Sequence, residues 1–393
     1  MKIVIIIPTY NERTNIAKLI PLLEKEIFPR IKSHDMYVLV VDDKSPDGTA
    51  EEVTVFMKQW KNIQLLSGDK NGLGAAYVRG MKYAMEKMQA DAVMEFDADF
   101  QHDPNDIPKL ITALDDGADY VIGSRYIEGG SIPKEWGLDR KILSIFGNWF
   151  TRVVWRNFTI HDMTSGFKLT KTSFLKKIDL DNLLSNHFAY KMQILHDAVK
   201  YGAKVKEVPI VFLEREKGTS KISKKDQFES FYVVLRLGTY PYKRFIKFMV
   251  VGGTGFFLQF LTVYIAIHFG SEQFIAAMIG GETAILSNFV LNNVWTFGDT
   301  KSIKQQGSFF KRLVKFNLAS LGSIAIQGVV TYFAVAALGE QMNVLGLTVP
   351  TSMIILIPTI ILLVIPLNYF IYNKVIWKTQ YLQKPKADHA KTS

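Results

Sequence analysis

Four long apolar stretches in the carboxyl-terminal part constrain what this chain can fold into more than any other feature. They cover Phe245–Phe269, Glu272–Phe297, Phe316–Leu338 and Leu347–Asn373. Each is long enough for a helix to cross a hydrocarbon layer of about 30 Å at about 1.5 Å per residue. A hydrophobic content of 48% with a positive mean hydropathy is also high for a purely soluble chain. We therefore predict an all-α transmembrane domain with four helices over residues 245–378.

The basic residues lie between these stretches and predict their orientation. The connections at 270–273 and 339–346 contain no lysine or arginine, whereas 301–315 and the tail from Lys374 hold five each. The positive-inside rule then places the middle loop and both termini in the cytosol. The net charge of +10 favours anionic lipid headgroups or phosphate substrates as partners, and no nucleic acid. The apolar run in residues 1–8 is too short for a signal peptide, and a chain without cysteine has neither disulfides nor thiolate metal sites.

The amino-terminal half alternates apolar runs of strand length with helical patterns. We expect strands at 2–7, 36–41, 63–66, 92–96 and 120–125, and helices at 14–23, 50–60, 73–88 and 140–150. This alternation predicts an α/β fold with a doubly wound, mostly parallel sheet. In such sheets ligands lie beyond the carboxyl ends of the strands.

The sequence Asp97-Ala98-Asp99 follows one of these strands and brings two carboxylates together. In an extended chain the two acidic side chains point to the same side, about 6.6 Å apart. With Gln101 they offer the oxygen ligands that Mg²⁺ or Mn²⁺ prefers, so we predict a metal site at Asp97, Asp99 and Gln101. The alternative is a solvated acidic turn, since aspartate and proline are common after strands.

Several motifs together resemble a known family. They are Pro8–Glu12, Val41–Thr49, Gly72–Gly74 and Asp97–Pro104. In order and spacing over about 230 residues they resemble the family 2 glycosyltransferases of the GT-A (Rossmann-like) fold, and among these the enzymes that transfer mannose to dolichol phosphate. Lys44 departs from the pattern, because the family usually has glycine there; it either constrains the loop or brings a lysine near the nucleotide.

The resemblance implies roles for individual residues. Pro8, Tyr10, Glu12, Val41, Asp42 and Asp43 would line the base and ribose pocket, although Tyr10 is equally well explained as a packing ring. Asp97 and Ala98 would face the ribose and sugar, while Asp99 and Gln101 would hold the metal against the diphosphate. Asp99 and Arg125 would be catalytic.

The acceptor side is expected after the strand that ends at Arg125. The resemblance places Arg125 at the sugar and the acceptor phosphate, and a guanidinium suits phosphate; the alternative is a surface ion pair. The amphipathic helix at 140–150 would lie in the membrane interface with Arg140 and Ser144 at the lipid phosphate, or else pack against the core. The related motif Asp162–Phe167 is interpreted as a structural turn near the acceptor.

Two further features refine the predicted reaction. The segment 206–221 resembles the family loop that closes over the diphosphate, with Lys206, Val208, Arg215 and Lys221 as donor-binding residues; the alternative is a solvated charged loop. Relatives that glycosylate hydroxyl groups carry an acidic base and a Gln-x-x-Arg-Trp motif hereabouts, and neither is present. A phosphate monoester with a second pKa near ~6 needs no such base, which favours a phosphate acceptor.

These observations predict an integral, multi-pass membrane enzyme with its catalytic domain in the cytosol. We expect a catalytic domain at 1–225, an interfacial amphipathic helix and linker at 226–244, the transmembrane domain at 245–378 and a tail at 379–393. The four-span region more distantly resembles GtrA-like domains. The predicted reaction is inverting transfer of mannose from GDP-mannose to dolichyl or another polyprenyl phosphate. The alternatives are a UDP-glucose-dependent glucosyltransferase of the same kind, and a membrane translocase or scaffold that only binds a nucleotide sugar.

Overall fold

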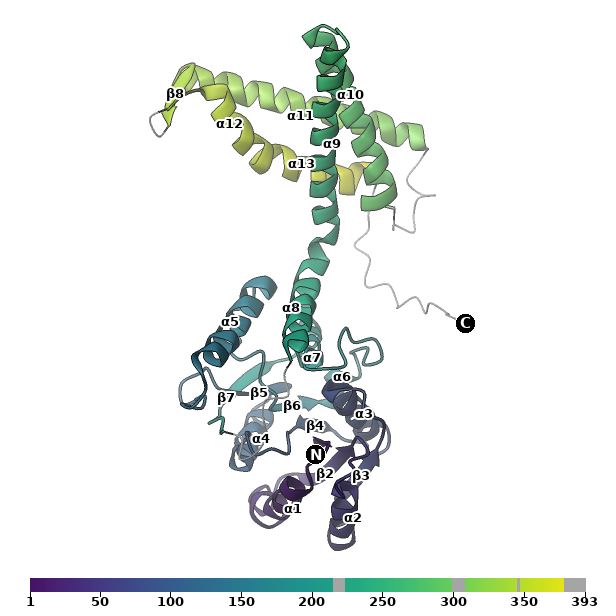
Figure 1. Ribbon diagram of the computed structural model, residues 1–393, viewed down its shortest axis with the longest axis vertical. Coiled ribbons are helices and arrows are strands. Elements are labelled where there is room, and N and C mark those ends of the chain that lie inside the picture. Colours follow the sequence, from purple (N-terminus) through teal and green to yellow (C-terminus); the bar gives the residue numbers. More distant parts are fainter. Residues whose placement is uncertain (215–222, 299–307, 345–346, 378–393) are drawn as a thin grey trace. The chain divides into compact units, whose positions relative to one another are not determined.

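The chain forms two compact units. The computed structural model describes residues 1–214, 223–298, 308–344 and 347–377. The first unit is Met1–Tyr240, and the second begins at Pro241. The first alternates strands and helices, whereas the second is built mainly from long helices (Figure 1).

The elements of the first unit follow the predicted alternation closely. In chain order they are β1 (Lys2–Thr9), α1 (Arg13–Leu22), β2 (Asp35–Asp42), α2 (Thr49–Gln59), β3 (Ile63–Ser67), α3 (Leu73–Glu86), β4 (Ala92–Glu95), α4 (Ile107–Asp115), β5 (Tyr120–Ser124), α5 (Leu138–Trp155), β6 (Lys168–Lys171), α6 (Thr172–Leu175), α7 (Tyr190–Lys200), β7 (Val205–Pro209) and α8 (Lys224–Thr239).

The strands form one seven-stranded sheet in the order β3-β2-β1-β4-β6-β5-β7. All neighbouring pairs are parallel except those of β6, which is antiparallel to both β4 and β5. The predicted α/β class with a mostly parallel sheet is therefore confirmed. Because β6 runs the other way, its first residue, Lys168, lies beside Glu95 at the end of β4. The loop that precedes β6 consequently reaches the same rim as the carboxyl ends of the other strands.

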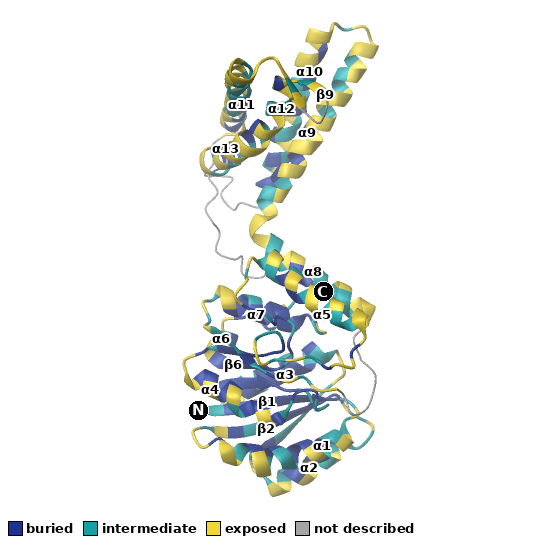
Figure 2. Cartoon of the chain, turned by 90° about the vertical axis from the view of Figure 1, so that its left-hand side faces the viewer, coloured by how far each residue is buried: buried dark blue, intermediate teal, exposed yellow. Residues whose placement is uncertain are grey.

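Helices cover both faces of the sheet, as the alternation of side chains in β1 requires. Ile3, Ile5 and Ile7 pack with α1, α2 and α4, whereas Val4 and Ile6 pack with α3 and α7. Both sets are fully buried. Figure 2 shows the buried strands inside the unit and the more exposed helices around them. A sheet covered on both faces explains why the strands are continuous apolar runs.

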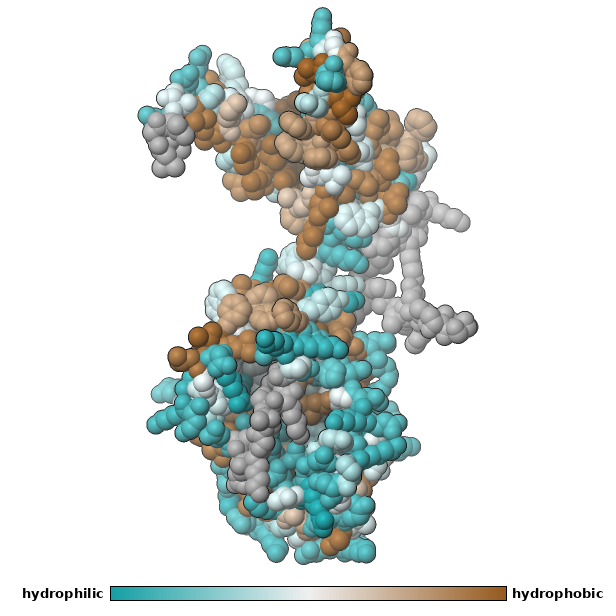
Figure 3. Space-filling view, in the orientation of Figure 1, coloured by the Kyte–Doolittle hydropathy of each residue, from teal (hydrophilic) through white to brown (hydrophobic). Residues whose placement is uncertain are grey.

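The second unit contains long apolar helices and one short hairpin. Its elements are α9 (Lys243–His268), α10 (Gln273–Leu291), a π-helical turn (Asn292–Thr296), α11 (Phe309–Leu338), β8 (Gln341–Val344), β9 (Leu347–Pro350), α12 (Thr351–Thr359), a π-helical turn (Ile360–Val364), α13 (Ile365–Ile371) and a π-helical turn (Tyr372–Ile376). Within the described residues, four helical stretches are long and apolar enough to cross a membrane. Figure 3 shows apolar side chains spread over this unit, whereas the first unit is largely hydrophilic.

The spans begin at other residues than the sequence predicts. Helix α11 starts at Phe309, where the Ser308 hydroxyl accepts a hydrogen bond from the amide of Lys311 (3.4 Å). The last span starts at Thr351, because the residues from Leu347 to Pro350 pair with β8 in an antiparallel hairpin. Apolar composition alone does not separate a strand of a hairpin from the first turn of a helix.

Candidate active site

A cavity of about 960 Å³ lies in the first unit, at the rim where the strands end. The tips of β1, β2 and β5, the segment after β4, helix α5 and helix α8 all contribute to its wall. Eleven of the residues predicted for the site line it, namely Pro8, Tyr10, Glu12, Asp43, Asp97, Ala98, Asp99, Gln101, Arg125, Arg140 and Ser144. The topology thus brings together residues that are scattered over more than 130 positions of the sequence.

Of the predicted residues that the structure describes, four others do not line the cavity. Val41 lies in the core, and Val208 lies in the core on the opposite face of the sheet. The Asp42 carboxylate is buried and accepts hydrogen bonds from Thr9 (2.9 Å) and Ser45 (2.6 Å). Lys206 pairs instead with Asp116 at the surface (2.8 Å), where both side chains are about half exposed. Arg215 and Lys221 lie outside the described residues.

The Asp97 carboxylate is held from one side by a buried tyrosine. Tyr77 of α3 donates a hydrogen bond to Oδ1 of Asp97 (2.8 Å), and its ring stacks on Tyr190 with 5.6 Å between centroids. Tyr190 in turn donates to Glu95. Burial raises the pKa of both tyrosines, so each keeps its proton and acts as a donor. This arrangement fixes one oxygen of Asp97 and leaves the other toward the cavity side.

Beneath this chain of hydrogen bonds, a buried glutamate and a buried lysine occupy neighbouring positions across the sheet. Glu95 and Lys168 are cross-strand neighbours in the register of β4 and β6, and both side chains are buried. Burial raises the pKa of Glu95 and lowers the pKa of Lys168 to about 7. Lys168 donates a hydrogen bond to the Lys191 carbonyl (3.2 Å), and the pairing of β6 with β4 brings the loop before β6 close to Asp97.

The turn that carries Asp99 and Gln101 contains a residue in a strained conformation. Hydrogen bonds within the turn and to the segment after β7 hold it in place. Phe100 has a φ of 58°, in the left-handed region that non-glycine residues rarely adopt. The Gln101 amide donates to Oδ1 of Asp99 (3.1 Å), and the Gln101 carbonyl accepts from the Leu213 amide (2.9 Å). Both side chains line the cavity. Backbone strain held by hydrogen bonds on both sides is typical of a turn that positions ligands.

His102 closes the floor of the cavity as an uncharged ring. It packs against Phe96, Phe167 and Phe212 with centroid distances of 6.2, 5.2 and 4.9 Å. Burial lowers the pKa of His102 to about 4, so the imidazole is neutral near pH 7.

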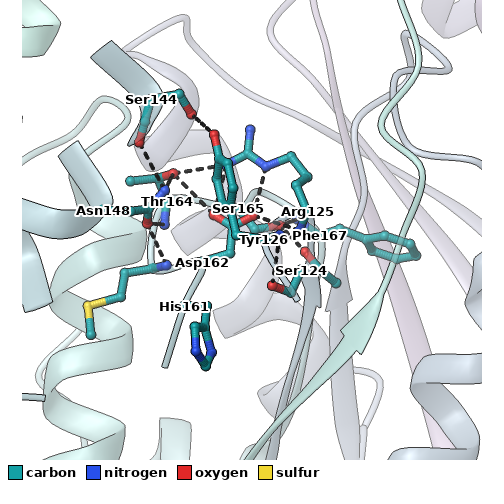
Figure 4. A network of polar contacts seen from close by, with 12 residues as sticks. Ser124, Arg125, Tyr126, Ser144, Asn148, His161, Asp162, Thr164, Ser165 and Phe167 are labelled. Atoms are coloured by element: carbon teal, nitrogen blue, oxygen red, sulfur yellow. Dashed lines mark hydrogen bonds and ion pairs between the residues drawn. The ribbon is translucent and has the colours of Figure 1, made fainter. Parts of the chain in front are cut away.

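Arg125 is buried. Figure 4 shows how Asp162 binds it. Its Nε and Nη2 donate to the two carboxylate oxygens of Asp162 (2.7 and 2.8 Å), and its amide donates to Oδ2 (3.0 Å). Nη2 also donates to the Thr164 hydroxyl (2.9 Å). Burial alone would raise the pKa of Asp162, but the Arg125 charge and hydrogen bonds outweigh it and lower that pKa. Arg125 therefore lines the cavity as part of a fixed, bidentate pair.

Helix α5 brings the other residues predicted for the acceptor to the cavity. Asn148 anchors the helix, because its side chain accepts from the amides of Met163 (2.8 Å) and Thr164 (3.3 Å) and donates to the Thr164 hydroxyl (3.1 Å) (Figure 4). Ser144 accepts a hydrogen bond from Tyr126 (2.6 Å). The Arg140 guanidinium lies 3.9 Å from the centroid of the Trp136 ring.

Towards α8 the cavity becomes apolar. Leu143, Gly147 and Phe150 of α5 face Phe231 and Val234 of α8 across it, and the rings of Phe150 and Phe231 are 5.1 Å apart. Outside the cavity, α5 exposes large apolar side chains, namely Leu138, Ile142, Ile145, Phe146, Trp149 and Val153. The site thus has a polar end at the strand tips and an apolar end between two amphipathic helices.

At the opposite side of the rim, Lys44 occupies a backbone position that suits glycine. Its φ is 53°, and its ammonium pairs with Asp69 (2.5 Å), with both side chains exposed. Lys70, two residues from Gly72, places its ammonium 3.3 Å from the centroid of the Tyr10 ring. The cation at this end of the cavity is therefore Lys70, which sequence reasoning missed.

Other lining residues also escaped prediction. They include Trp136, His187, Lys191 and Asp226. Of these, only Lys191 gave a signal that could have found it, because it shares a helix face with Ile194 and Leu195, and a lysine is out of place on an apolar face.

The comparisons with known proteins divide the chain in the same way. Residues 4–179 match the model of glycosyl transferase family 2, and residues 247–377 match the GtrA/DPMS transmembrane domain. A dolichol-phosphate mannosyltransferase from Pyrococcus furiosus is 33% identical over 342 residues, which are 86% of this chain and 92% of the relative. A polyprenol monophosphomannose synthase from Mycolicibacterium smegmatis is 36% identical over 60% of this chain and 86% of its own length. An undecaprenyl-phosphate mannosyltransferase from Micrococcus luteus is 35% identical over 57% of this chain and 88% of its own length.

Proposed function

The chain belongs to glycosyl transferase family 2 and carries a GtrA/DPMS transmembrane domain, and from this premise we propose that it transfers mannose from GDP-mannose to dolichyl or another polyprenyl phosphate. The transfer is a single displacement that inverts the anomeric carbon. All three relatives described above are named for mannosyl transfer to lipids of this class, which favours mannose over glucose as the transferred sugar.

The observation that carries the proposal is the two-ended cavity. Its polar end offers carboxylates for ribose and sugar hydroxyls, and Tyr10 with Lys70 offers a ring and a cation for the nucleotide. Its apolar end, between α5 and α8, suits the first isoprene units of a lipid. Arg125, Arg140 and Ser144 also line the cavity, and we assign to them the lipid phosphate that meets the sugar there.

The residues at the strand tips fit a divalent cation. Asp99 and Gln101 both line the cavity, and with Asp97 they form the set of hard oxygen donors that Mg²⁺ and Mn²⁺ take. When bound there, the ion supplies positive charge that stabilises the leaving diphosphate.

The chain's own residues then hold the reactants in place. The lipid phosphate is already an anion at neutral pH, so no general base is required. One of its oxygens forms the new bond to the anomeric carbon as the bond from that carbon to the diphosphate breaks, and the electron pair leaves with GDP. Arg140 and Arg125 orient the attacking phosphate, and the Asp162 pair keeps Arg125 from moving with it.

The protein is a membrane protein with four candidate spans in its described residues. We place the catalytic unit and both termini in the cytosol, because the basic segments flank that side of the spans. This orientation agrees with a soluble nucleotide sugar as the donor.

The decisive experiment is a donor screen with the purified full-length protein. Radiolabelled GDP-mannose, UDP-glucose and UDP-N-acetylglucosamine are each offered with one polyprenyl phosphate, and lipid-linked label is extracted and counted. We expect transfer from GDP-mannose. Transfer from UDP-glucose alone would identify a glucosyltransferase, and nucleotide-sugar binding without turnover would identify a non-catalytic binding protein.

A further inference from the structure

Lys191 places a buried cation on the wall of the cavity. It lies in the first turn of α7, and the residue is only 8% exposed. Its ammonium lies 5.1 Å from the centroid of the Phe188 ring, and the described residues give it no hydrogen-bond acceptor. A buried ammonium without an acceptor is costly to keep, so the cavity is the direction from which a partner would come.

Three polar atoms surround one small space beside Lys191. A Cβ atom on Gly166 would stand 3.3 Å from Nζ of Lys191, 3.4 Å from Nε2 of His102 and 3.5 Å from Oδ2 of Asp97. Gly166 is not among the residues with positive φ, so its backbone conformation does not demand glycine. The missing side chain instead keeps this space open between a cation, an imidazole and a carboxylate.

The chemistry of this space selects a hydroxyl group. Oδ1 of Asp97 already accepts from Tyr77, and Oδ2 is the oxygen that borders this space. A hydroxyl accepts from an ammonium and donates to a carboxylate at the same time. A phosphate oxygen can only accept, and the Asp97 charge would repel it. Neighbouring hydroxyls of a hexose meet both requirements.

We propose that Lys191, with Asp97 and His102, forms a subsite that reads the hydroxyls of the transferred sugar, and that Gly166 keeps this subsite open. The proposal rests on the proposed function in assuming that a nucleotide sugar occupies the cavity. Lys191 then acts as a specificity-determining residue, because the hydroxyl it contacts is a fixed feature of the sugar.

The test combines Lys191→Met with deoxy sugars, using the full-length protein. Wild type and variant are compared on GDP-mannose and on its 2-, 3-, 4- and 6-deoxy analogues. Loss of a hydrogen bond to a charged group lowers kcat/KM by about 10- to 150-fold. Lys191→Met should therefore lower kcat/KM for GDP-mannose by this factor. For the analogue that lacks the contacted hydroxyl, wild type and variant should differ by less than about threefold, because the interaction is already absent.

Binding of GDP alone separates this role from a structural one. Calorimetric titration should give the same affinity for wild type and Lys191→Met, which also shows that the variant is folded. Gly166→Ala should reduce transfer and likewise leave GDP affinity unchanged. Lys200→Met, at the exposed end of the same helix, should match the wild type throughout.

Two outcomes overturn the proposal. One is an equal loss for every deoxy analogue; the other is a weakened affinity for GDP itself. If the wild type transfers a sugar other than mannose, the same series is made with that sugar's deoxy analogues. Absence of transfer from GDP-mannose therefore contradicts the mannose assignment. An equal effect of Lys191→Met on every analogue in the series contradicts the subsite.

Discussion

Breaking the ion pair between Arg125 and Asp162 by replacing one partner should strongly destabilise the folded protein. Both side chains are buried, so Asp162→Asn leaves the guanidinium charge uncompensated at a cost of about 3–5 kcal/mol. In a unit of this size the midpoint of thermal unfolding should fall on the order of 10 °C. Asp116→Asn is the control, because its exposed pair with Lys206 should contribute about 1 kcal/mol or less.

The same pair predicts how stability depends on pH. The pKa of Asp162 is lowered in the folded protein, so in the acid range the unfolded chain binds the extra proton. Its stabilisation is complete above the ordinary aspartate pKa of about 4 and is lost as the pH falls further. Unfolding midpoints measured from pH 7 to pH 3 should decline less steeply in Asp162→Asn. Equal slopes would contradict the assignment.

The dependence of transfer activity on a divalent cation should require Asp99. An amide is a poorer ligand for a hard cation than a carboxylate, so Asp99→Asn should lose turnover together with its response to added Mg²⁺ or Mn²⁺. The measurement is transfer rate against cation concentration after chelation. Asp103→Asn, a nearby carboxylate that caps a helical turn outside the cavity lining, is the matched control. Full wild-type activity in excess EDTA would rule out the metal.

Arg140 should matter for the lipid and not for the donor. Charge-assisted contacts to phosphate are worth roughly 1.5–3 kcal/mol, so Arg140→Ala should lower kcat/KM for the polyprenyl phosphate by about 10- to 150-fold. Arg140→Lys should recover only part, because an ammonium lacks the planar fork. Donor affinity, titrated without lipid, should stay unchanged, and Arg152→Ala on the same helix is the control. If donor binding is lost while lipid kinetics survive, the acceptor assignment is wrong.

At the level of elements, Asn148 joins α5 to the loop before β6. Asn148→Leu removes hydrogen bonds to Met163 and Thr164 and leaves a buried amide without a partner. At about 1 kcal/mol for each bond, the loss should be about 2–4 kcal/mol, with a raised KM for the lipid. Thermal unfolding measures the loss of stability, and acceptor kinetics measure the KM for the lipid. Asn182→Leu, at an exposed position, is the control for both measurements. An unchanged KM would show that α5 keeps its place without this anchor.

Elements whose signal is local could be predicted, and those that depend on distant partners could not. The apolar runs of β1, β2 and β4 end in acidic turns that mark the rim. Strand β6 carries no such pattern, because it contains Lys168, which is buried beside Glu95, a residue 73 positions earlier in the chain. Tyr77 was missed for the same reason, since it is an ordinary residue of an amphipathic helix until the fold places Asp97 against it.

At the scale of the whole molecule, the absence of cysteine gives a clean test of orientation. Single cysteines at Glu272 or Gln341, in the exposed connections that lack basic residues, should react with an impermeant maleimide from outside intact cells. Cysteines at Lys304 or Ser393 should react only after permeabilisation. Labelling of Lys304→Cys from outside would overturn the cytosolic assignment.

The antiparallel strand also makes the proposed acceptor side of the site a separable module. Residues 125–167 leave the sheet at the end of β5 and return at the start of β6, its immediate neighbour, where the Gly123 amide donates to the Phe167 carbonyl (2.9 Å). This excursion holds Arg125, Arg140, Ser144 and Asp162, while the carboxylates of the donor side lie outside it. A segment whose two ends are adjacent can be exchanged as a cassette without re-pairing the sheet. Grafts of this piece between relatives should therefore exchange lipid preference while nucleotide preference stays with the recipient, as kinetics on paired lipids and donors would measure.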